Sequence, residues 1–332
     1  MLRLHPYVFY RPATLAEAAA LLRDHADDVM PIAGGTDLVP NMKHGLFTPS
    51  HVVALRQLPE LRGIVERQGE VVIGAAEALA GVARNTVIRQ RLPSLARAAG
   101  LVAGPQLRNM GTIGGNVCLD TRCTYYNQTH FWRNALGYCL KKDGDICHVT
   151  KVGKKCVAAH SADTPPVLLT LDAALDFVSA DGERTVPIAE YFVADGIWNN
   201  VRRPHEILAR VRVPVPSSTV RLAYQKLRQR NAIDFPLLSV AAAADVRDDV
   251  VVDLRIVVSA LGARPRVLTG LETIAHGQPL TVEVIDAVAE RAFQQCHPLT
   301  NIIVDPEWRR AMVPVHVRRA LEQLRTTERA AA

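Results

Sequence analysis

The first 56 residues combine short apolar runs with one amphipathic stretch. Thr14-Leu15-Ala16-Glu17 is a capping box, and an Ala- and Leu-rich segment follows it to about Asp24. In such a box the threonine and the glutamate satisfy free amides at the start of a helix. Apolar runs at 29–33 and 51–55 are typical of strands. The pattern predicts a small α/β unit over residues 1–56.

The next 160 residues alternate between strand and helix patterns, and no internal repeat is visible. Residues 63–75 alternate as a hairpin that turns at Gln68-Gly69, and a second turn falls at Asp181-Gly182. The remaining predicted elements are helices at about 77–85, 93–101 and 166–171 and strands at about 175–178, 184–188 and 206–213. We predict a larger α+β unit over residues 57–216.

The pattern changes after Pro214-Val215-Pro216-Ser217-Ser218, which marks a domain joint. Strand patterns at about 220–228, 237–246 and 251–260, with Asp248-Asp249 in the second connection, predict a three-stranded antiparallel meander. Helical patterns follow at about 266–276, 281–295 and 306–326, and the chain ends in an Ala-rich tail. The sequence predicts a third, sheet-and-helix domain over residues 217–332 and an α+β fold for the whole chain.

The composition is that of a globular protein, with 48% apolar and 22% charged residues. No apolar run approaches the length of a membrane span, and the N-terminus lacks the pattern of a secretory signal, so we expect a cytoplasmic protein. The net charge is +6, and residues 122–156 carry +5 of it, with seven basic against two acidic side chains. The basic excess belongs to one segment, which keeps a nucleic-acid-binding module open as an alternative.

Two glycine-rich segments stand out. Gly34-Gly35-Thr36-Asp37 follows a predicted strand, and Gly111-Thr112-Ile113-Gly114-Gly115-Asn116 follows a helix pattern. Glycine allows close approach of the backbone and positive φ, and consecutive amides can form a nest for an anion. Neither segment has the G-x-G-x-x-G spacing of a Rossmann site. Each alone is often a plain turn, but the pair fits the two ends of a pyrophosphate.

Together these segments resemble the paired FAD loops of the flavoprotein subunits of the xanthine dehydrogenase and carbon monoxide dehydrogenase family, and the similarity spans nearly the whole chain. The resemblance implies a two-part FAD-binding fold of the PCMH/VAO type, with a C-terminal domain over the flavin. The FAD-binding positions that it implies are Pro31, Ile32, Ala33, Gly34, Gly35, Thr36, Asp37, Leu38, Val102, Ala103, Gly111, Thr112, Ile113, Gly114, Gly115, Asn116, Cys118, Asp163, Leu208 and Lys226. Without it, Asp163 is typical of a helix N-cap and Lys226 of a solvated strand residue.

Four of the six cysteines lie in a segment that interrupts the path from the second glycine segment to Asp163. Cys123, Cys139, Cys147 and Cys156 are separated by 15, 7 and 8 intervening residues. Four thiolates suit a structural zinc or an iron–sulfur cubane, and the spacing lacks the C-x-x-C pairs that are typical of either. His130, His148 and His160 could complete a mixed zinc site, so the spacing leaves both metals open. Cys296 lies on a helical pattern and is expected in the core.

The residues around these cysteines narrow the choice through a second resemblance. Asp120-Thr121-Arg122-Cys123-Thr124-Tyr125-Tyr126 and Gly144-Asp145-Ile146-Cys147-His148 are similar to the beta subunits of the 4-hydroxybenzoyl-CoA reductase family. That resemblance implies a 4Fe–4S cluster in an inserted loop at 120–159, held by Cys123, Cys139, Cys147 and Cys156. The loop aromatics, among them Tyr125, Phe131 and Trp132, are expected to pack it.

The resemblance also implies a role. The chain would pass electrons from ferredoxin through the cluster and FAD to 2Fe–2S and molybdenum centres on two partner subunits, in a dimer of heterotrimers. The reaction implied is the reductive removal of a phenolic hydroxyl from 4-hydroxybenzoyl-CoA, in anaerobic aromatic degradation, with no catalytic residue on this chain. Ferredoxins are acidic, so we expect a docking patch of basic residues, namely Lys141, Lys142, Lys151, Lys154 and Lys155. The alternatives are an oxidative molybdenum hydroxylase that sends electrons outward and a zinc-stabilised nucleic-acid-binding module.

Overall fold

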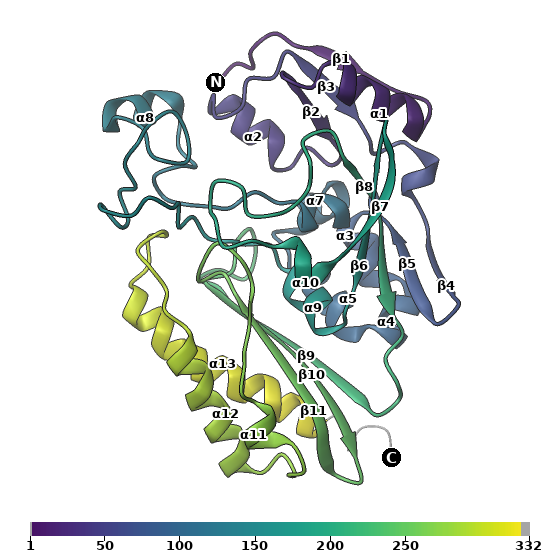
Figure 1. Cartoon of the computed structure of the whole chain (residues 1–332), viewed down its shortest axis with the longest axis vertical. Coiled ribbons are helices and arrows are strands. Elements are labelled where there is room, and N and C mark those ends of the chain that lie inside the picture. Colours follow the sequence, from purple (N-terminus) through teal and green to yellow (C-terminus); the bar gives the residue numbers. More distant parts are fainter. Residues whose placement is uncertain (1, 327–332) are drawn as a thin grey trace.

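The computed structural model describes residues 2–326 of the chain (Figure 1). Met1 and residues 327–332, which include the Ala-rich tail and the end of the predicted third domain, lie outside the described residues. Among the residues described, no helix is both long and apolar enough to cross a bilayer.

A parallel three-stranded sheet forms the N-terminal part, in the order β1 (Val8–Tyr10), β3 (His51–Ala54) and β2 (Val29–Ile32). Helices α1 (Leu15–Asp24) and α2 (Leu38–Lys43) accompany it, and the 3-10 helix η1 (Pro59–Leu61) leads out of it. The predicted helix start at Thr14 is confirmed, because its hydroxyl accepts a hydrogen bond from the Glu17 amide at 3.1 Å. This unit places Gly34 and Gly35 directly after β2.

A five-stranded antiparallel sheet forms the middle part and confirms both predicted hairpins. Its order is β4 (Ile64–Arg67), β5 (Glu70–Gly74), β8 (Ile207–Pro214), β6 (Ala174–Ser179) and β7 (Gly182–Pro187). The helices around it are α3 (Leu79–Arg84), α4 (Thr86–Arg91), α5 (Pro93–Gly100), α6 (Pro105–Met110), α7 (Ile113–Val117), α9 (Thr164–Thr170) and α10 (Ile188–Tyr191). The second glycine segment is therefore mostly the short helix α7, where a turn was expected.

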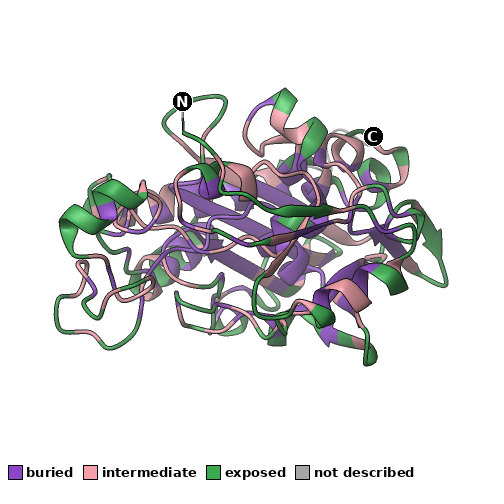
Figure 2. Ribbon diagram, turned by 90° about the horizontal axis from the view of Figure 1, so that it is seen from above, coloured by how far each residue is buried: buried purple, intermediate pink, exposed green. Residues whose placement is uncertain are grey.

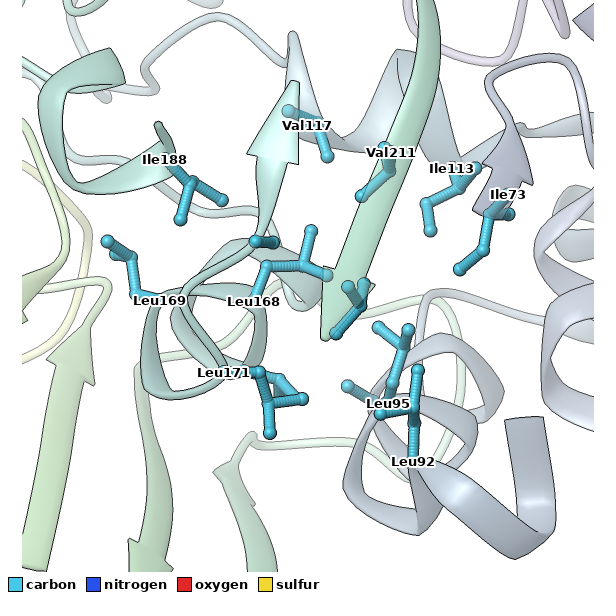
Figure 3. Packing of buried hydrophobic residues seen from close by; sticks show 14 of the residues in the cluster. Ile73, Leu92, Leu95, Ile113, Val117, Leu168, Leu169, Leu171, Ile188 and Val211 are labelled. Atoms are coloured by element: carbon cyan, nitrogen blue, oxygen red, sulfur yellow. The ribbon is translucent and has the colours of Figure 1, made fainter. Parts of the chain in front are cut away.

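The main core lies between this sheet and its helices. Figure 3 shows Ile73 and Val211 of the sheet facing Ile113 and Val117 of α7, with Leu168 of α9 and Leu92 and Leu95 nearby. These side chains are fully buried, and the strands are mostly purple in Figure 2. Burial of this apolar surface is the main stabilising contribution, and it fixes α7 and α9 under the cleft described below.

The C-terminal sheet has four strands, so the prediction of three was wrong by one. The predicted meander appears as β9 (Val220–Leu227), β10 (Leu238–Arg247) and β11 (Val250–Ser259), and the two-residue strand β12 (Arg266–Val267) pairs with β11. The helix predicted at 266–276 is therefore only α11 (Glu272–Ala275), because Gly270, with φ +72°, changes the chain direction before it. Helices α12 (Val282–Gln295) and α13 (Pro306–Thr326) cover the sheet, as Figure 1 shows.

The segment predicted as an insertion projects from the molecule and contains the helix α8 (His130–Leu136), at the left of Figure 1. Its base is closed by two backbone hydrogen bonds of 2.7 Å between Arg122 and Ala159. Arg133 of α8 is 1% exposed and donates to the carbonyl of Gly45 at 3.0 Å, so the insertion is anchored on the N-terminal unit.

Candidate functional site

A cavity of about 690 Å³ lies where the N-terminal and middle parts meet. It is predominantly apolar, with a few polar groups, which is the usual character of a cofactor site. All the FAD-binding residues predicted from the sequence line it except Ile113 and Lys226. Ile113 is fully buried in the core beneath the cavity.

The two glycine segments touch each other at Gly34. A Cβ atom at this position would lie only 2.2 Å from the carbonyl oxygen of Met110 and 2.7 Å from Cα of Gly111. Only glycine therefore allows this approach, which brings the two segments to one end of the cavity. Gly35 is the one glycine of the two segments with positive φ (+70°).

The backbone amides of the two segments differ in whether they already have hydrogen-bond acceptors within the protein, and the sequence did not indicate this difference. The amides of Gly111, Ile113, Gly114, Gly115 and Asn116 already donate within the protein, so the second segment is not the open nest that was expected. Within residues 2–326, no acceptor is found for the amides of Gly34, Gly35 and Thr36. The first segment therefore keeps its donors for an anionic ligand such as a diphosphate.

Asp163, which lines the cavity, and Lys226, which lies behind it, form a buried ion pair with N to O distances of 3.0 Å. Tyr224 donates to Asp163 at 2.7 Å, and Lys226 also donates to the carbonyl of Leu101. Lys226 is not a solvated strand residue, because its side chain is 1% exposed. Asp163 is at the N-cap position of α9, but its side chain makes no capping bond. Burial raises the pKa of Asp163 and lowers the pKa of Lys226, and their pairing opposes both shifts.

The remaining predicted residues contact the cavity from several elements. Leu208, on β8, is 6% exposed, and the thiol of Cys118 accepts a hydrogen bond from Tyr191 at 3.5 Å. Burial raises the pKa of Cys118, so the thiol stays protonated. The side chain of Asn116 accepts from both the amide and the hydroxyl of Thr164, and so ties α7 to α9.

Several lining residues escaped the sequence analysis. Arg122 pairs with Asp37 and stacks over the Phe235 ring, whose centroid lies 4.5 Å from its guanidinium carbon. Trp198 and Arg202 also line the cavity, with Arg202 over the Trp198 ring at 5.6 Å. No local motif marks these residues, because segments distant in the sequence bring them together.

The four cysteines of the insertion line one small cavity, beside the larger one. None of them forms a disulfide, and Cys139, Cys147 and Cys156 are buried. The structure therefore brings together side chains that are up to 33 positions apart in the sequence. Cys296 is buried in the C-terminal core, as expected.

The surroundings of the four cysteines shift the pKa values of their thiols in different directions. Burial, reinforced by the neighbouring Cys156, Cys139 and Cys147, raises the pKa of Cys123 to about 11. Burial also acts on Cys147, but hydrogen bonds led by those of Thr150 outweigh it and lower the pKa of this thiol. Hydrogen-bond donors at sulfur favour the thiolate, which is the form that binds metals.

Within residues 2–326, the three histidines are not arranged with the cysteines as a four-ligand zinc site. His160 is fully buried, and its Nδ1 lies 2.9 Å from the hydroxyl of Ser259, outside the cysteine cavity. His148 lines the cavity, but its Nε2 lies 2.6 Å from the carbonyl of Tyr138. His130 lies 3.4 Å from the hydroxyl of Tyr138.

The five lysines of the predicted basic patch differ in exposure, and Lys142 is partly exposed, with its ammonium group 3.7 Å from Asp143. Lys151, Lys154 and Lys155 are exposed, and they flank Cys147 and Cys156. Lys141 is 3% exposed and donates to Asp120 at 2.6 Å, so its place in a docking patch was predicted wrongly. Only Tyr126 of the loop aromatics is fully buried, whereas Phe131 is 81% exposed.

Comparison with known proteins agrees with this geometry. Residues 4–216 match the FAD binding domain in molybdopterin dehydrogenase, and residues 223–324 match the CO dehydrogenase flavoprotein C-terminal domain. The chain is 28% identical to the carbon monoxide dehydrogenase medium chain of Hydrogenophaga pseudoflava, over 95% of this chain and 96% of that one. It is 27% identical to the xanthine dehydrogenase FAD-binding subunit of Escherichia coli O157:H7, over 95% and 94% of the two chains.

The fold agrees as well. A carbon monoxide dehydrogenase structure from Hydrogenophaga pseudoflava superposes with a TM-score of 0.80 at 26% identity, covering 97% of this chain and 98% of that one. These matches give no support to the nucleic-acid-binding alternative. Because the FAD-binding domain alone matches more than half of the sequence, the chain belongs to the carbon monoxide dehydrogenase and xanthine dehydrogenase family of FAD-binding subunits.

Proposed function

We propose that this chain is an electron-transfer subunit that holds FAD in the 690 Å³ cavity and a 4Fe–4S cluster on Cys123, Cys139, Cys147 and Cys156. The observation that carries the proposal is the convergence of these four thiols on one cavity directly beside the FAD cleft. When bound, FAD exchanges one or two electrons and the cluster exchanges one, so the pair suits a chain of single-electron transfers.

The residues of the cleft fit the flavin cofactor. The free amides at Gly34, Gly35 and Thr36 suit the diphosphate, and Gly34 permits the contact between the two segments. The apolar wall that includes Val102 and Leu208 suits the flavin ring. The Asp163–Lys226 pair fixes α9 and β9 against each other at this wall.

The choice of a cluster over zinc rests on the resemblance of the residues around the cysteines to a family that holds a 4Fe–4S cluster in this loop. Within residues 2–326, no group of three or more His, Cys, Asp or Glu side chains is arranged to hold a single metal ion, whereas the four cysteines line one cavity. Four cysteine thiolates are the usual complement of a 4Fe–4S cubane.

The finer assignment is a 4-hydroxybenzoyl-CoA reductase type of enzyme. Electrons from ferredoxin would pass by way of the cluster and FAD to 2Fe–2S and molybdenum centres, on a small and a large partner subunit of a dimer of heterotrimers. The description of one relative as a medium chain supports smaller and larger partners. Exposed Lys151, Lys154 and Lys155 beside the cysteine cavity support an acidic donor at this end.

Metal and flavin analysis of the full-length chain, purified without oxygen, tests the proposal. We expect about four irons per FAD, no stoichiometric zinc, and flavin absorption bands over a broad iron–sulfur shoulder. Cys139→Ser should lose the iron and keep the FAD, whereas Cys296→Ala, at the cysteine outside the loop, should keep both. Zinc in place of iron, or iron that survives the loss of Cys139, would overturn the cluster assignment.

A further inference from the structure

Two residues line both cavities. Tyr126 and Lys141 belong to the wall of the FAD cleft and also to the wall of the cysteine cavity, and they are the only residues common to both walls in the described part of the chain. Tyr126 is 3% exposed, and the side chain of Lys141 is also 3% exposed. Anything that passes directly between the two cavities meets this pair.

The ammonium group of Lys141 is fixed by three oxygens. It donates to Asp120 Oδ1 at 2.6 Å, to Thr121 Oγ1 at 2.5 Å and to the carbonyl of Gly196 at 2.5 Å. It also lies 4.6 Å from the centre of the Tyr126 ring. A lysine has three ammonium donors, and all of them are used here, so the charge cannot swing out to solvent.

Tyr126 and Gly196 fix the position of the Lys141 ammonium group between the two cavities. The Tyr126 hydroxyl donates to Asp120 Oδ2 at 2.9 Å, so one carboxylate holds both residues. The amide of Gly196 donates to the carbonyl of Cys156, and a Cβ on Gly196 would lie 2.8 Å from the sulfur of Cys156. The same glycine therefore touches Lys141 on one side and a proposed cluster ligand on the other.

We propose that Lys141 is a buried charge shared by the two redox sites, and that it makes both of them easier to reduce. The inference rests on the proposed function, since it takes the four cysteines to hold a cluster. Each site gains negative charge when it takes up an electron, and a fixed cation in a poorly solvated wall stabilises that charge far more than a cation in water does. Asp120 offsets part of this effect, and its side chain is 34% exposed, so water screens it more than Lys141.

Redox titration of the loaded, full-length chain tests this inference. The flavin is followed by its absorption and the cluster by the electron paramagnetic resonance of its reduced form. Lys141→Gln should lower both midpoint potentials, and Asp120→Asn, which removes the opposing charge, should raise both. Arg89→Gln removes the same charge from an exposed site on α4, where it lines neither cavity, and it should leave both potentials where they are in the wild type.

Unchanged potentials in Lys141→Gln, with full FAD and iron, would overturn the inference, and so would a shift at only one of the two sites. If Lys141→Gln does not fold or does not bind FAD and iron, Asp120→Asn tests the inference instead. Midpoint potentials that do not rise in Asp120→Asn would contradict a charge shared by the two sites. The iron content of the wild-type chain tests the proposed function separately, so a failure of one is distinguishable from a failure of the other.

Discussion

Asn301 reaches from the C-terminal domain to the insertion, where its Nδ2 donates to the carbonyl of Val157 at 2.7 Å. Its own carbonyl accepts a hydrogen bond from the amide of Thr124 at 2.8 Å. Thr124 and Val157 are the residues that follow Cys123 and Cys156. One fully buried residue therefore holds the first and last cysteines of the insertion.

Replacement of this residue should loosen the insertion. Asn301→Ala leaves the carbonyl of Val157 without its donor, and a buried polar group without a partner costs about 1–3 kcal/mol of unfolding free energy. Urea unfolding measures this loss, and the rate of iron release to a chelator should rise. Gln294→Ala changes an exposed amide of the same domain and serves as the control. Equal iron release from both variants would argue against a clamp formed by Asn301 on Thr124 and Val157.

Gly34→Ala should strongly weaken FAD binding while the fold is retained. The new methyl group would meet the carbonyl of Met110 at 2.2 Å, so the two glycine segments would have to separate. Titration of the flavin-free chain with FAD, followed by flavin fluorescence, should show affinity reduced by roughly a hundredfold or more, about 2.7 kcal/mol. Gly81→Ala is the matched control, because its nearest neighbour is a side-chain oxygen at 3.5 Å and alanine favours the helix.

Reversal of the charge at Lys154 and Lys155 should slow reduction by an acidic ferredoxin. These exposed residues precede Cys156, so their field acts on a donor that approaches the cysteine cavity. We expect the second-order rate at low salt to fall by about tenfold or more, and the difference from the wild type to shrink as salt screens the charges. Arg89→Glu, on the surface of α4, should leave the rate unaltered, and an equal effect at both places would argue against a local docking patch.

Acid should weaken the fold through His160. Burial lowers the pKa of His160 to about 3, against an ordinary value near 6.5. The histidine is neutral in the folded chain and takes up a proton on unfolding, so its contribution is fully present above pH 6.5 and is lost as the pH falls toward 3. The slope is at most about 1.4 kcal/mol per pH unit.

Unfolding by urea at several pH values between 4 and 8 measures this dependence. His160→Gln should flatten the slope, whereas His5→Gln, at an exposed position, should keep it. A slope that is the same in all three proteins would assign the acid sensitivity to other groups.

The elements that could be predicted are those with a local signal. Alternation marked the hairpin around Gln68-Gly69, since a half-buried strand repeats every two residues. Continuous apolar runs separated by Asp248-Asp249 marked the strands β10 and β11. The strand β12 has only two residues, and it exists because Val257 offers a partner to Val267. Such an edge pairing depends on a neighbour that is supplied by the fold, so the local pattern predicted a helix there.

Prediction of the candidate site from local sequence patterns was limited in the same way. The glycine segments and the four cysteines are visible as residue types, and the structure brings each set together. Lys141 was predicted at the surface because a lysine in a basic loop is usually solvated. Its burial depends on Asp120, on Thr121 and on Gly196, which is 55 residues away. Likewise, the pairing of Lys226 with Asp163 joins residues that no local pattern connects.

The clamp at Asn301 has a consequence for the order in which the protein is made. The four cysteines leave the ribosome well before Asn301, and before Arg309, which donates to the side chain of Asn301 and to the carbonyl of Ala260. The two hydrogen bonds by which Asn301 holds Thr124 and Val157 are therefore missing until most of the chain has been synthesised. Stable retention of the proposed cluster would then depend on translation of the C-terminal domain, and a chain that ends before Asn301 should release iron faster than the full chain.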